Sequence, residues 1–340
     1  MKALAVHRGA TAGELVGRVL CHDIRGHRNE IVFRKGHALR VDDFPPLADA
    51  PWTEIHLIEL GPGDLGQREA GQRLAGCLSS DGLQASPAGH RHVLKARHNG
   101  LVRIDVAALQ RLNSVPGIAV YTLLNDQVAA KDQTVAEAQI TPLVIDRPSI
   151  EAAEEIAGEE GNVIRLVPFA PRDAVVWMRD ERHLGALSEK LRWFGCAVRE
   201  VIDLPRDSSA IRDSMERRAG TLSGSAAPLF LVSGSNALDP LDPVFAALES
   251  LGAKMQRIGM PVHPGTLLWI ASWREITIVG LPTCGLGTQL TAFDLILPKL
   301  LAKGGIRDEE LAALGHGGIL STRRSEAMDP QPLERRTVES

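Results

Sequence analysis

The chain has 340 residues, 44% of them hydrophobic and 24% charged, and its formal net charge is −4 at pH 7. A nucleic-acid binder usually shows a basic face and stacking aromatic side chains. With 5 Trp, 7 Phe and 1 Tyr, this chain is expected to bind no nucleic acid. No apolar run approaches the roughly 20 residues of a membrane span, and Arg8 comes too early for a signal-peptide core. We therefore expect a cytoplasmic protein without a membrane segment.

Short strand-like segments punctuated by glycine and proline dominate residues 1–150. They are 15–20, 30–33, 54–60, 100–104 and 118–123. A helix is predicted over 67–78, where Leu74 and Leu78 stand four residues apart, and 102–112 passes from a strand into a short helix. This part of the chain is interpreted as an elongated α+β region, followed by a linker at 151–171 whose charged start also fits a helix.

Histidines and cysteines give no metal signature. His90, His92 and His98 lack a nearby carboxylate or cysteine, so we expect a solvated basic loop there. The four cysteines are scattered and form no CxxC, which argues against a disulfide framework or a structural zinc site. Cys77 and Cys196 are expected to be buried thiols.

From Asp173 onward, strands alternate with helices. Expected strands are 174–178, 197–202, 228–233, 267–271 and 276–279, and expected helices are 181–195, 243–251 and 290–301. Asp207 is expected to cap a further helix that carries Ile211 and Met215 on its buried side. This alternation predicts an α/β domain over 172–320, built as a three-layer, mostly parallel sheet with helices on both faces. The polar residues 321–340 are expected to be a disordered tail.

Small and polar residues follow three of these strands. Arg179, Asp180 and Glu181 follow the first, V-S-G-S-N-A-L-D-P-L-D (232–242) ends the third, and G-L-P-T-C-G-L-G (280–287) ends the last. Ligands bind at such strand ends in parallel sheets, where free N–H groups and helix dipoles favour phosphate. The acids there would suit Mg²⁺ with a phosphorylated substrate. Alternatively, each acid, including Asp207 and Asp242, only caps a helix.

These motifs resemble the molybdopterin-binding domain shared by molybdopterin molybdenumtransferases and adenylyltransferases. The spacing from Ser233-Gly234-Ser235 to Asp242 resembles a GGxSxGxxD-type loop. Asp180-Glu181 is similar to the T-G-D-E motif, Pro264-Gly265 to P-G-K-P, and Gly280-Leu281-Pro282 to G-L-P-G-N-P, while Asp207 stands where the family has an Asp before the helix after its second strand.

Further stretches carry the same resemblance. G-R-V-L-C-H-D-I, F-R-K-G-H-A-L-R-V-D-D-F-P-P-L and W-T-E-I-H-L-I-E-L resemble the region that precedes the binding domain, which makes 1–150 transferase-like. G-M-P-V-H-P-G-T-L-L and L-G-H-G-G-I-L are similar to a bacterial subgroup, some members of which are fused to a nucleotidyltransferase.

The resemblance implies a molybdopterin ligand, Mg²⁺, and roles for individual residues. Asp207 and Asp242 would be catalytic, and Asp180 and Glu181 would shape the pterin pocket. The full set of implied cofactor-binding residues is Arg179, Asp180, Glu181, Ser233, Gly234, Ser235, Asp239, Pro264, Gly265, Gly280, Leu281, Pro282 and Thr283. A homodimer and a nucleotidyltransferase or molybdoenzyme partner are also implied.

The chain departs from the family pattern at several positions. Ser235 replaces the second loop glycine, Ala237 the loop serine and Thr266 the lysine of P-G-K-P, whose charge Arg179 is a candidate to replace. The chain also lacks an M-D-G-Y-A stretch. Three functions therefore stay open: molybdenum cofactor biosynthesis with molybdate insertion, non-catalytic carriage of molybdopterin, and nucleotide pyrophosphatase activity.

Overall fold

The computed structural model describes residues 1–158, 162–221, 227–235, 237–282, 289–302 and 306–320. The chain divides into two compact units, unit 1 (residues 1–166) and unit 2 (residues 167–340). The expected linker at 151–171 contains most of helix α5 (Arg147–Gly158) and strand β14 (Ile164–Pro168), and β14 pairs in a sheet with β9 (Gly100–Ile104). The expected tail at 321–340 lies outside the described residues.

Unit 1 begins with a small antiparallel sheet. Strand β5 (Glu54–Glu59) pairs with β1 (Lys2–His7) on one side and β2 (Val19–Leu20) on the other. The connecting elements are α1 (Ala12–Leu15), β3 (Ile24–Arg25), β4 (Ile31–Phe33), η1 (Val41–Asp43) and α2 (Phe44–Asp49). Buried Leu20, Ile55 and Leu57 centre its core.

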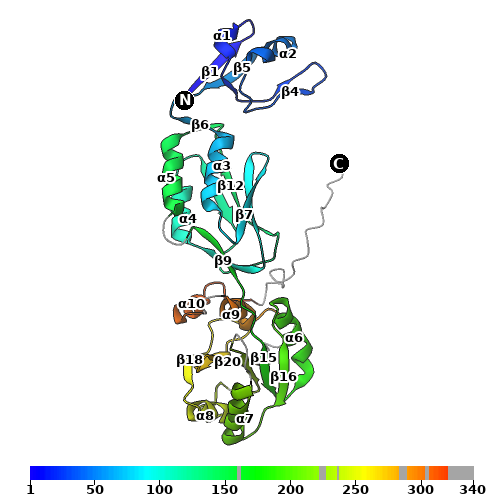
Figure 1. Ribbon diagram of the computed structural model, residues 1–340, viewed down its shortest axis with the longest axis vertical. Coiled ribbons are helices and arrows are strands. Elements are labelled where there is room, and N and C mark those ends of the chain that lie inside the picture. The colour runs from blue at the N-terminus through cyan, green and yellow to red at the C-terminus, as the bar shows by residue number, and fades with distance from the viewer. Residues whose placement is uncertain (159–161, 222–226, 236, 283–288, 303–305, 321–340) are drawn as a thin grey trace. The chain divides into compact units, whose positions relative to one another are not determined.

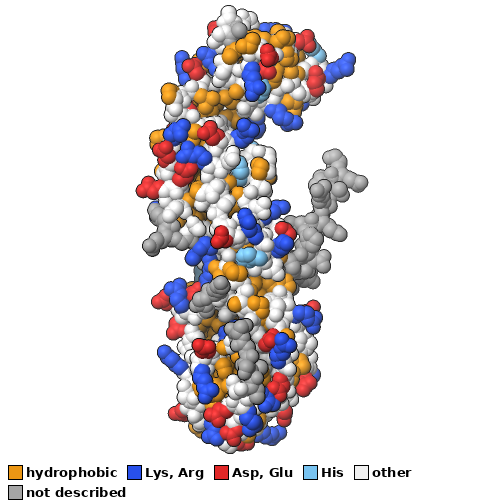
Figure 2. All heavy atoms as spheres, in the orientation of Figure 1, with side chains coloured by type: hydrophobic (Ala, Val, Ile, Leu, Met, Phe, Trp, Pro, Cys, Tyr) orange, Lys and Arg blue, Asp and Glu red, His pale blue; other side chains and the backbone are white. Residues whose placement is uncertain are grey.

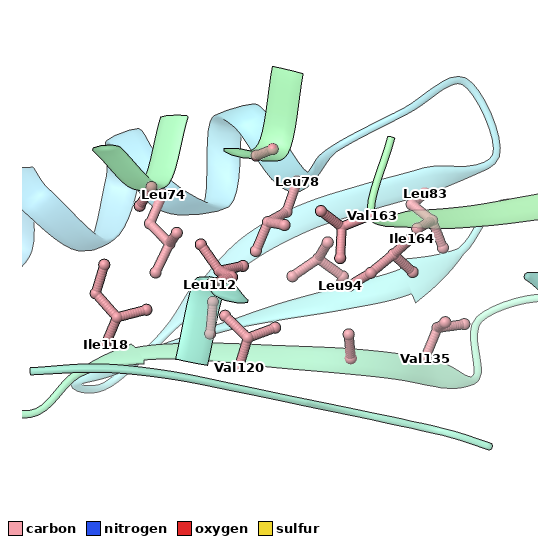
Figure 3. Close-up of a cluster of buried hydrophobic side chains, with 14 of the residues drawn as sticks. Leu74, Leu78, Leu83, Leu94, Leu112, Ile118, Val120, Val135, Val163 and Ile164 are labelled. Carbon is pink, nitrogen blue, oxygen red and sulfur yellow. The ribbon is translucent and has the colours of Figure 1, made fainter. Parts of the chain in front are cut away.

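The second part of unit 1 is an antiparallel sheet covered by helices (Figure 1). The strand order is β10 (Ile118–Thr122), β12 (Thr134–Ile140), β8 (Arg91–Ala96), β7 (Leu83–Ala88). Helix α3 (Gln67–Leu78) has the predicted bounds and packs Leu74 and Leu78 on the sheet (Figure 3). The remaining elements are β6 (Asp64–Gly66), α4 (Val106–Asn113), β11 (Val128–Ala129) and β13 (Val144–Asp146).

The basic loop expected at 90–98 is wrong for His92, which lies within strand β8. The period-2 alternation of His92, Leu94 and Ala96 places their side chains on one face, and Leu94 and Ala96 belong to the core. Burial lowers the pKa of His92. The strand was not predicted because its other face carries the charged residues Arg91 and Lys95, which are typical of an exposed loop.

Unit 2 contains a six-stranded sheet. Its order is β16 (Val198–Asp203), β15 (Ala174–Met178), β17 (Leu229–Ser233), β20 (Ile276–Leu281), β19 (Trp269–Trp273), β18 (Lys254–Ile258). The first four strands are parallel neighbours, whereas β18, β19 and β20 pair antiparallel. The expected mostly parallel sheet is therefore a mixed one. Only Arg274 and Glu275 separate β19 from β20, and a two-residue connection permits only a hairpin.

Unit 2 has helices between and after these strands. They are η2 (Glu181–His183), α6 (Leu184–Trp193), α7 (Ser208–Thr221), α8 (Pro243–Ser250), α9 (Ala292–Leu301) and α10 (Asp308–Ala313). Residues of α7 and α8 share one core with Trp177, Phe230 and Ile278 of the sheet. Right-handed crossovers in opposite directions from β15 and β16 place α6 on the face opposite α7. Among the described helices, none is long and apolar enough to span a membrane.

Candidate functional site

The strand order of unit 2 places a topological switch point at the carboxyl edge of the sheet. The chain leaves β15 for β16 on one side and then returns to form β17 on the other side. The loops after β15 and β17 consequently diverge toward opposite faces, and ligands bind at such a switch point in open α/β sheets. Trp177 is opposite Val232 in the register, so Arg179 and Gly234 follow neighbouring strand ends.

The predicted loop residues do gather at this edge. Ser233 pairs with Leu281, which brings Ser233-Gly234-Ser235 beside Gly280-Leu281-Pro282. Trp269 pairs with Gly280 in the antiparallel register, so the segment that ends in β19, with Pro264 and Gly265, reaches the same edge. Thr283 lies outside the described residues.

Gly234 brings the first two loops into contact. Its φ of +103° lies in the region that favours glycine. A Cβ atom on Gly234 would lie 3.9 Å from Cγ and Cδ of Arg179 and 3.7 Å from a methyl group of Leu204. The aliphatic stem of Arg179 therefore lies against the glycine, while the residue as a whole is exposed.

Ser235, which replaces a family glycine, has a structural partner. Its hydroxyl accepts a hydrogen bond from Nε1 of the buried Trp269 at 3.0 Å. The indole of Trp269 covers Gly280 so closely that any side chain at Gly280 would collide with it. Trp269 was not among the residues predicted for this site. The available clue was its pairing with Gly280 across a hairpin, since a glycine opposite a large apolar residue leaves room for its ring.

Pro264 and Gly265 are fixed by their neighbours. The N–H of Ala292 donates to the carbonyl of Pro264 at 2.9 Å, and a Cβ on Gly265 would lie 2.5 Å from that of Ala292. His263 exchanges backbone hydrogen bonds with Gly318 and Leu320, both at 2.8 Å. The two C-terminal motifs, 259–268 and 314–320, thus form one paired structure. Thr266, at the position of the missing lysine, donates its hydroxyl to the carbonyl of Val262.

The predicted acids cap helices. Asp242 is buried and accepts from the N–H of Val244 at 2.9 Å, and Asp207 accepts from Ala210 at 2.8 Å. The bond from Ala210 lowers the pKa of Asp207. Asp180 binds the side chain and N–H of Arg182, and these bonds lower its pKa to about 2.

Asp239 and Glu181 are exposed at the same loops. Asp239 accepts from the N–H of Leu241 at 2.9 Å, which organises the turn before α8. The described residues contain no group of three or more His, Cys, Asp or Glu that fits a metal ion. The acids described here thus do not form a cage for Mg²⁺ made by the protein alone.

An open apolar groove of about 470 Å³ continues from the loop after β17. Its wall includes Leu238 and Pro240 of that loop, Phe245 of α8, and Met255 and Ile258 of β18. The sequence did not predict this groove, because β18 was not expected. Figure 2 shows acidic and basic side chains interspersed over the visible face of unit 2, in the lower part of the picture.

Comparisons with known proteins give limited matches. Residues 13–59 match the model of a domain of unknown function (DUF8806). No curated protein matches the chain. A molybdopterin biosynthesis MoeA protein from Pyrococcus horikosii is 13% identical with a TM-score of 0.29, covering 70% of this chain and 79% of its own. A molybdenum cofactor biosynthesis protein from Pyrococcus furiosus is 13% identical with a TM-score of 0.24, covering 71% of this chain and 72% of its own. The likeness in fold is weak.

Proposed function

We propose that unit 2 binds molybdopterin or its adenylylated form, and that the chain serves molybdenum cofactor biosynthesis. The observation that carries the proposal is the switch point between β15 and β17. Four motifs that resemble the molybdopterin-binding family, at 180–181, 233–235, 264–265 and 280–282, surround this one edge of the sheet. The parallel strands bring these loops to one edge, and that edge is where ligands bind in open α/β sheets.

The chemistry of the edge suits a ligand that has a phosphate and a flat apolar ring. Glycine at 234 leaves the backbone accessible, and Arg179 supplies a positive charge beside it. The groove that starts at Ala237 and Leu238 offers apolar surface a few residues further along the same loop. We assign the phosphate to the loops and the rest of the ligand to the neighbouring surface.

Carriage of the ligand fits the acids better than molybdate insertion does. Asp207 and Asp242 each use an oxygen for a helix cap, which is a structural task. In the catalytic alternative both acids would also act on a reacting anhydride. Any magnesium ion would then enter with the ligand phosphates, because Mg²⁺ commonly binds one or two carboxylates together with substrate phosphate.

Binding of molybdopterin to the full chain, followed by tryptophan fluorescence under anaerobic conditions, tests the proposal. We expect a Kd that is micromolar or tighter, about −8 kcal/mol. Asp242→Asn is the matched variant, since asparagine also caps helices and keeps the fold. Absence of molybdopterin binding by the wild type overturns the proposed function.

Turnover separates the remaining functions. Molybdate-dependent turnover that Asp242→Asn abolishes, with binding retained, identifies a transferase. Binding without turnover identifies a carrier that delivers the ligand to a nucleotidyltransferase or molybdoenzyme. Release of AMP from a simple dinucleotide identifies a pyrophosphatase instead.

A further inference from the structure

We propose that Arg179 binds the terminal phosphate of molybdopterin through its guanidinium. The inference rests on the proposed function for the identity of the ligand and extends it to one residue and one chemical group. Thr266, at the position of the family's lysine, is neutral and donates its hydroxyl to the carbonyl of Val262. It precedes β19, which β17 and β20 separate from β15, so Arg179 supplies a charge at a different point of the same edge.

The location of Arg179 is the first argument. It is the first residue after β15, and β15 is the strand at which the chain changes direction along the sheet. Its stem packs against Gly234 on the adjacent strand end, with the Cβ position of that glycine 3.9 Å from Cγ and Cδ. This packing places the Arg179 side chain beside the Ser233–Ser235 loop, where small residues let a ligand approach the backbone.

The state of the neighbouring cations is the second argument. The guanidinium of Arg182 is neutralised by Asp180, to which its Nε lies at 2.7 Å. Lys190 is bound to the buried Asp294 at 2.7 Å and to the carbonyl of Gln289 at 3.2 Å. Arg179, in contrast, makes no hydrogen bond or ion pair within the part of the chain that the structure describes, and it is exposed.

The chemistry of the side chain is the third argument. A guanidinium presents a planar fork that matches two oxygens of a phosphate, whereas an ammonium acts as a point charge. A phosphate monoester carries about −1.5 to −2 charges at pH 7 and three acceptor oxygens. The ligand class that Arg179 selects is therefore a phosphate monoester, such as the terminal phosphate of molybdopterin. We expect Arg179 to contribute little to the binding of the pterin ring.

Arg206 provides a matched control. It is exposed, follows β16 at the outer end of the sheet, and makes no hydrogen bond or ion pair with another described residue. Arg206→Met removes the same charge as Arg179→Met, but one strand farther from the switch point. A larger loss of affinity in Arg179→Met than in Arg206→Met therefore indicates a specific contact with the phosphate. Equal losses indicate a general electrostatic attraction of the ligand to this edge of the sheet.

The experiment is a set of titrations of the full chain with molybdopterin and with molybdopterin from which phosphatase has removed the phosphate. For molybdopterin we expect Arg179→Met to weaken binding about 10- to 100-fold, Arg179→Lys about 5- to 10-fold, and Arg206→Met less than about 2-fold. The dephosphorylated ligand should bind wild type and Arg179→Met equally. Thermal unfolding of each variant is measured alongside and should match the wild type, because both arginines are exposed.

The inference is overturned if Arg179→Met binds molybdopterin like the wild type, or if Arg206→Met weakens binding as much. It is also overturned if Arg179→Met loses as much affinity for the dephosphorylated ligand. If the wild type fails to bind molybdopterin, titration with AMP, another phosphate monoester, decides. Binding of AMP that needs Arg179 keeps the assignment of this residue and removes the proposed function, whereas no binding of either compound overturns both.

Discussion

At the scale of single residues, Cys77 links burial to a measurable pH dependence. It lies on α3, its thiol donates to the carbonyl of Leu74 at 3.0 Å, and burial raises its pKa from 9.0 to about 11. Between these values the unfolded chain loses the thiol proton while the folded chain keeps it. Folding stability therefore falls as the pH rises from 9 to 11, by about 1 kcal/mol after allowance for partial exposure.

Two measurements check this prediction for Cys77. Urea unfolding of the wild type between pH 8 and 11 should show a steeper alkaline loss of stability than the same series on Cys77→Ala. Alkylation followed by mass spectrometry should modify Cys21 well before Cys77 at pH 8, because burial raises the pKa of Cys77 to about 11 and so keeps its thiol protonated. Parallel alkaline slopes, or equally fast modification of both thiols, would contradict the prediction.

The acids show what residue types can and cannot predict. The sequence located Asp207 and Asp242 at helix starts, because each precedes an amphipathic run. It left open whether they cap a helix or meet a ligand, since both tasks select aspartate at the same position. The contacts to Ala210 and Val244 establish the caps. The catalytic roles expected for these two acids stay predictions, which turnover of Asp242→Asn tests.

At the scale of elements, the packing of Trp269 on Gly280 joins the β19–β20 hairpin to the loop after β17. A Cβ on Gly280 would lie 1.9 Å from the indole, which is itself 1% exposed and bonded to Ser235. Gly280→Ala must therefore displace the ring. We expect a loss of about 1–3 kcal/mol in the free energy of unfolding, measured by urea titration.

A double-mutant cycle and a control sharpen the test of this contact. Trp269→Leu makes room for a methyl group, so the double variant should be more stable than the sum of the two single losses by about 1 kcal/mol or more. Gly185→Ala, where a Cβ meets nothing within 4 Å on helix α6, should leave stability unchanged or raise it by up to about 1 kcal/mol. Additive losses in the cycle would show that the indole does not restrict position 280.

The elements also show why part of the sheet could not be predicted. Strand β15 has the expected bounds because an apolar run, A-V-V-W-M, stands between charged residues. Strand β18, K-M-Q-R-I, was missed because an edge strand carries charges and lacks a continuous apolar run. The hydrophobic pattern of a strand does not indicate whether it pairs parallel or antiparallel with its neighbours. The direction of β19 could have been inferred from the two-residue connection at Arg274 and Glu275, which forces an antiparallel pair. The antiparallel β19 makes the sheet mixed and brings Pro264 and Gly265 to the candidate site.

At the scale of the whole molecule, the two compact units each have a core of their own. The style of the sequence changes near residue 150, where strands punctuated by glycine and proline give way to alternating strands and helices. The tryptophans are distributed unequally between the two units. Only Trp52 belongs to unit 1, whereas the other four of the 5 lie in unit 2. Tryptophan fluorescence therefore reports mainly on the unit that carries the candidate site.

This division predicts that a ligand stabilises one unit selectively. A ligand that binds only the folded form of unit 2 should stabilise it by RT ln(1 + [L]/Kd), about 2.7 kcal/mol at 100 times Kd. Added molybdopterin should thus move the fluorescence-detected urea midpoint to higher urea. Alkylation of Cys77 reports on unit 1 in the same samples, and its urea dependence should not move. Equal shifts of both signals would contradict the prediction. They would mean that the two cores unfold together, so that a ligand bound to unit 2 stabilises unit 1 as well.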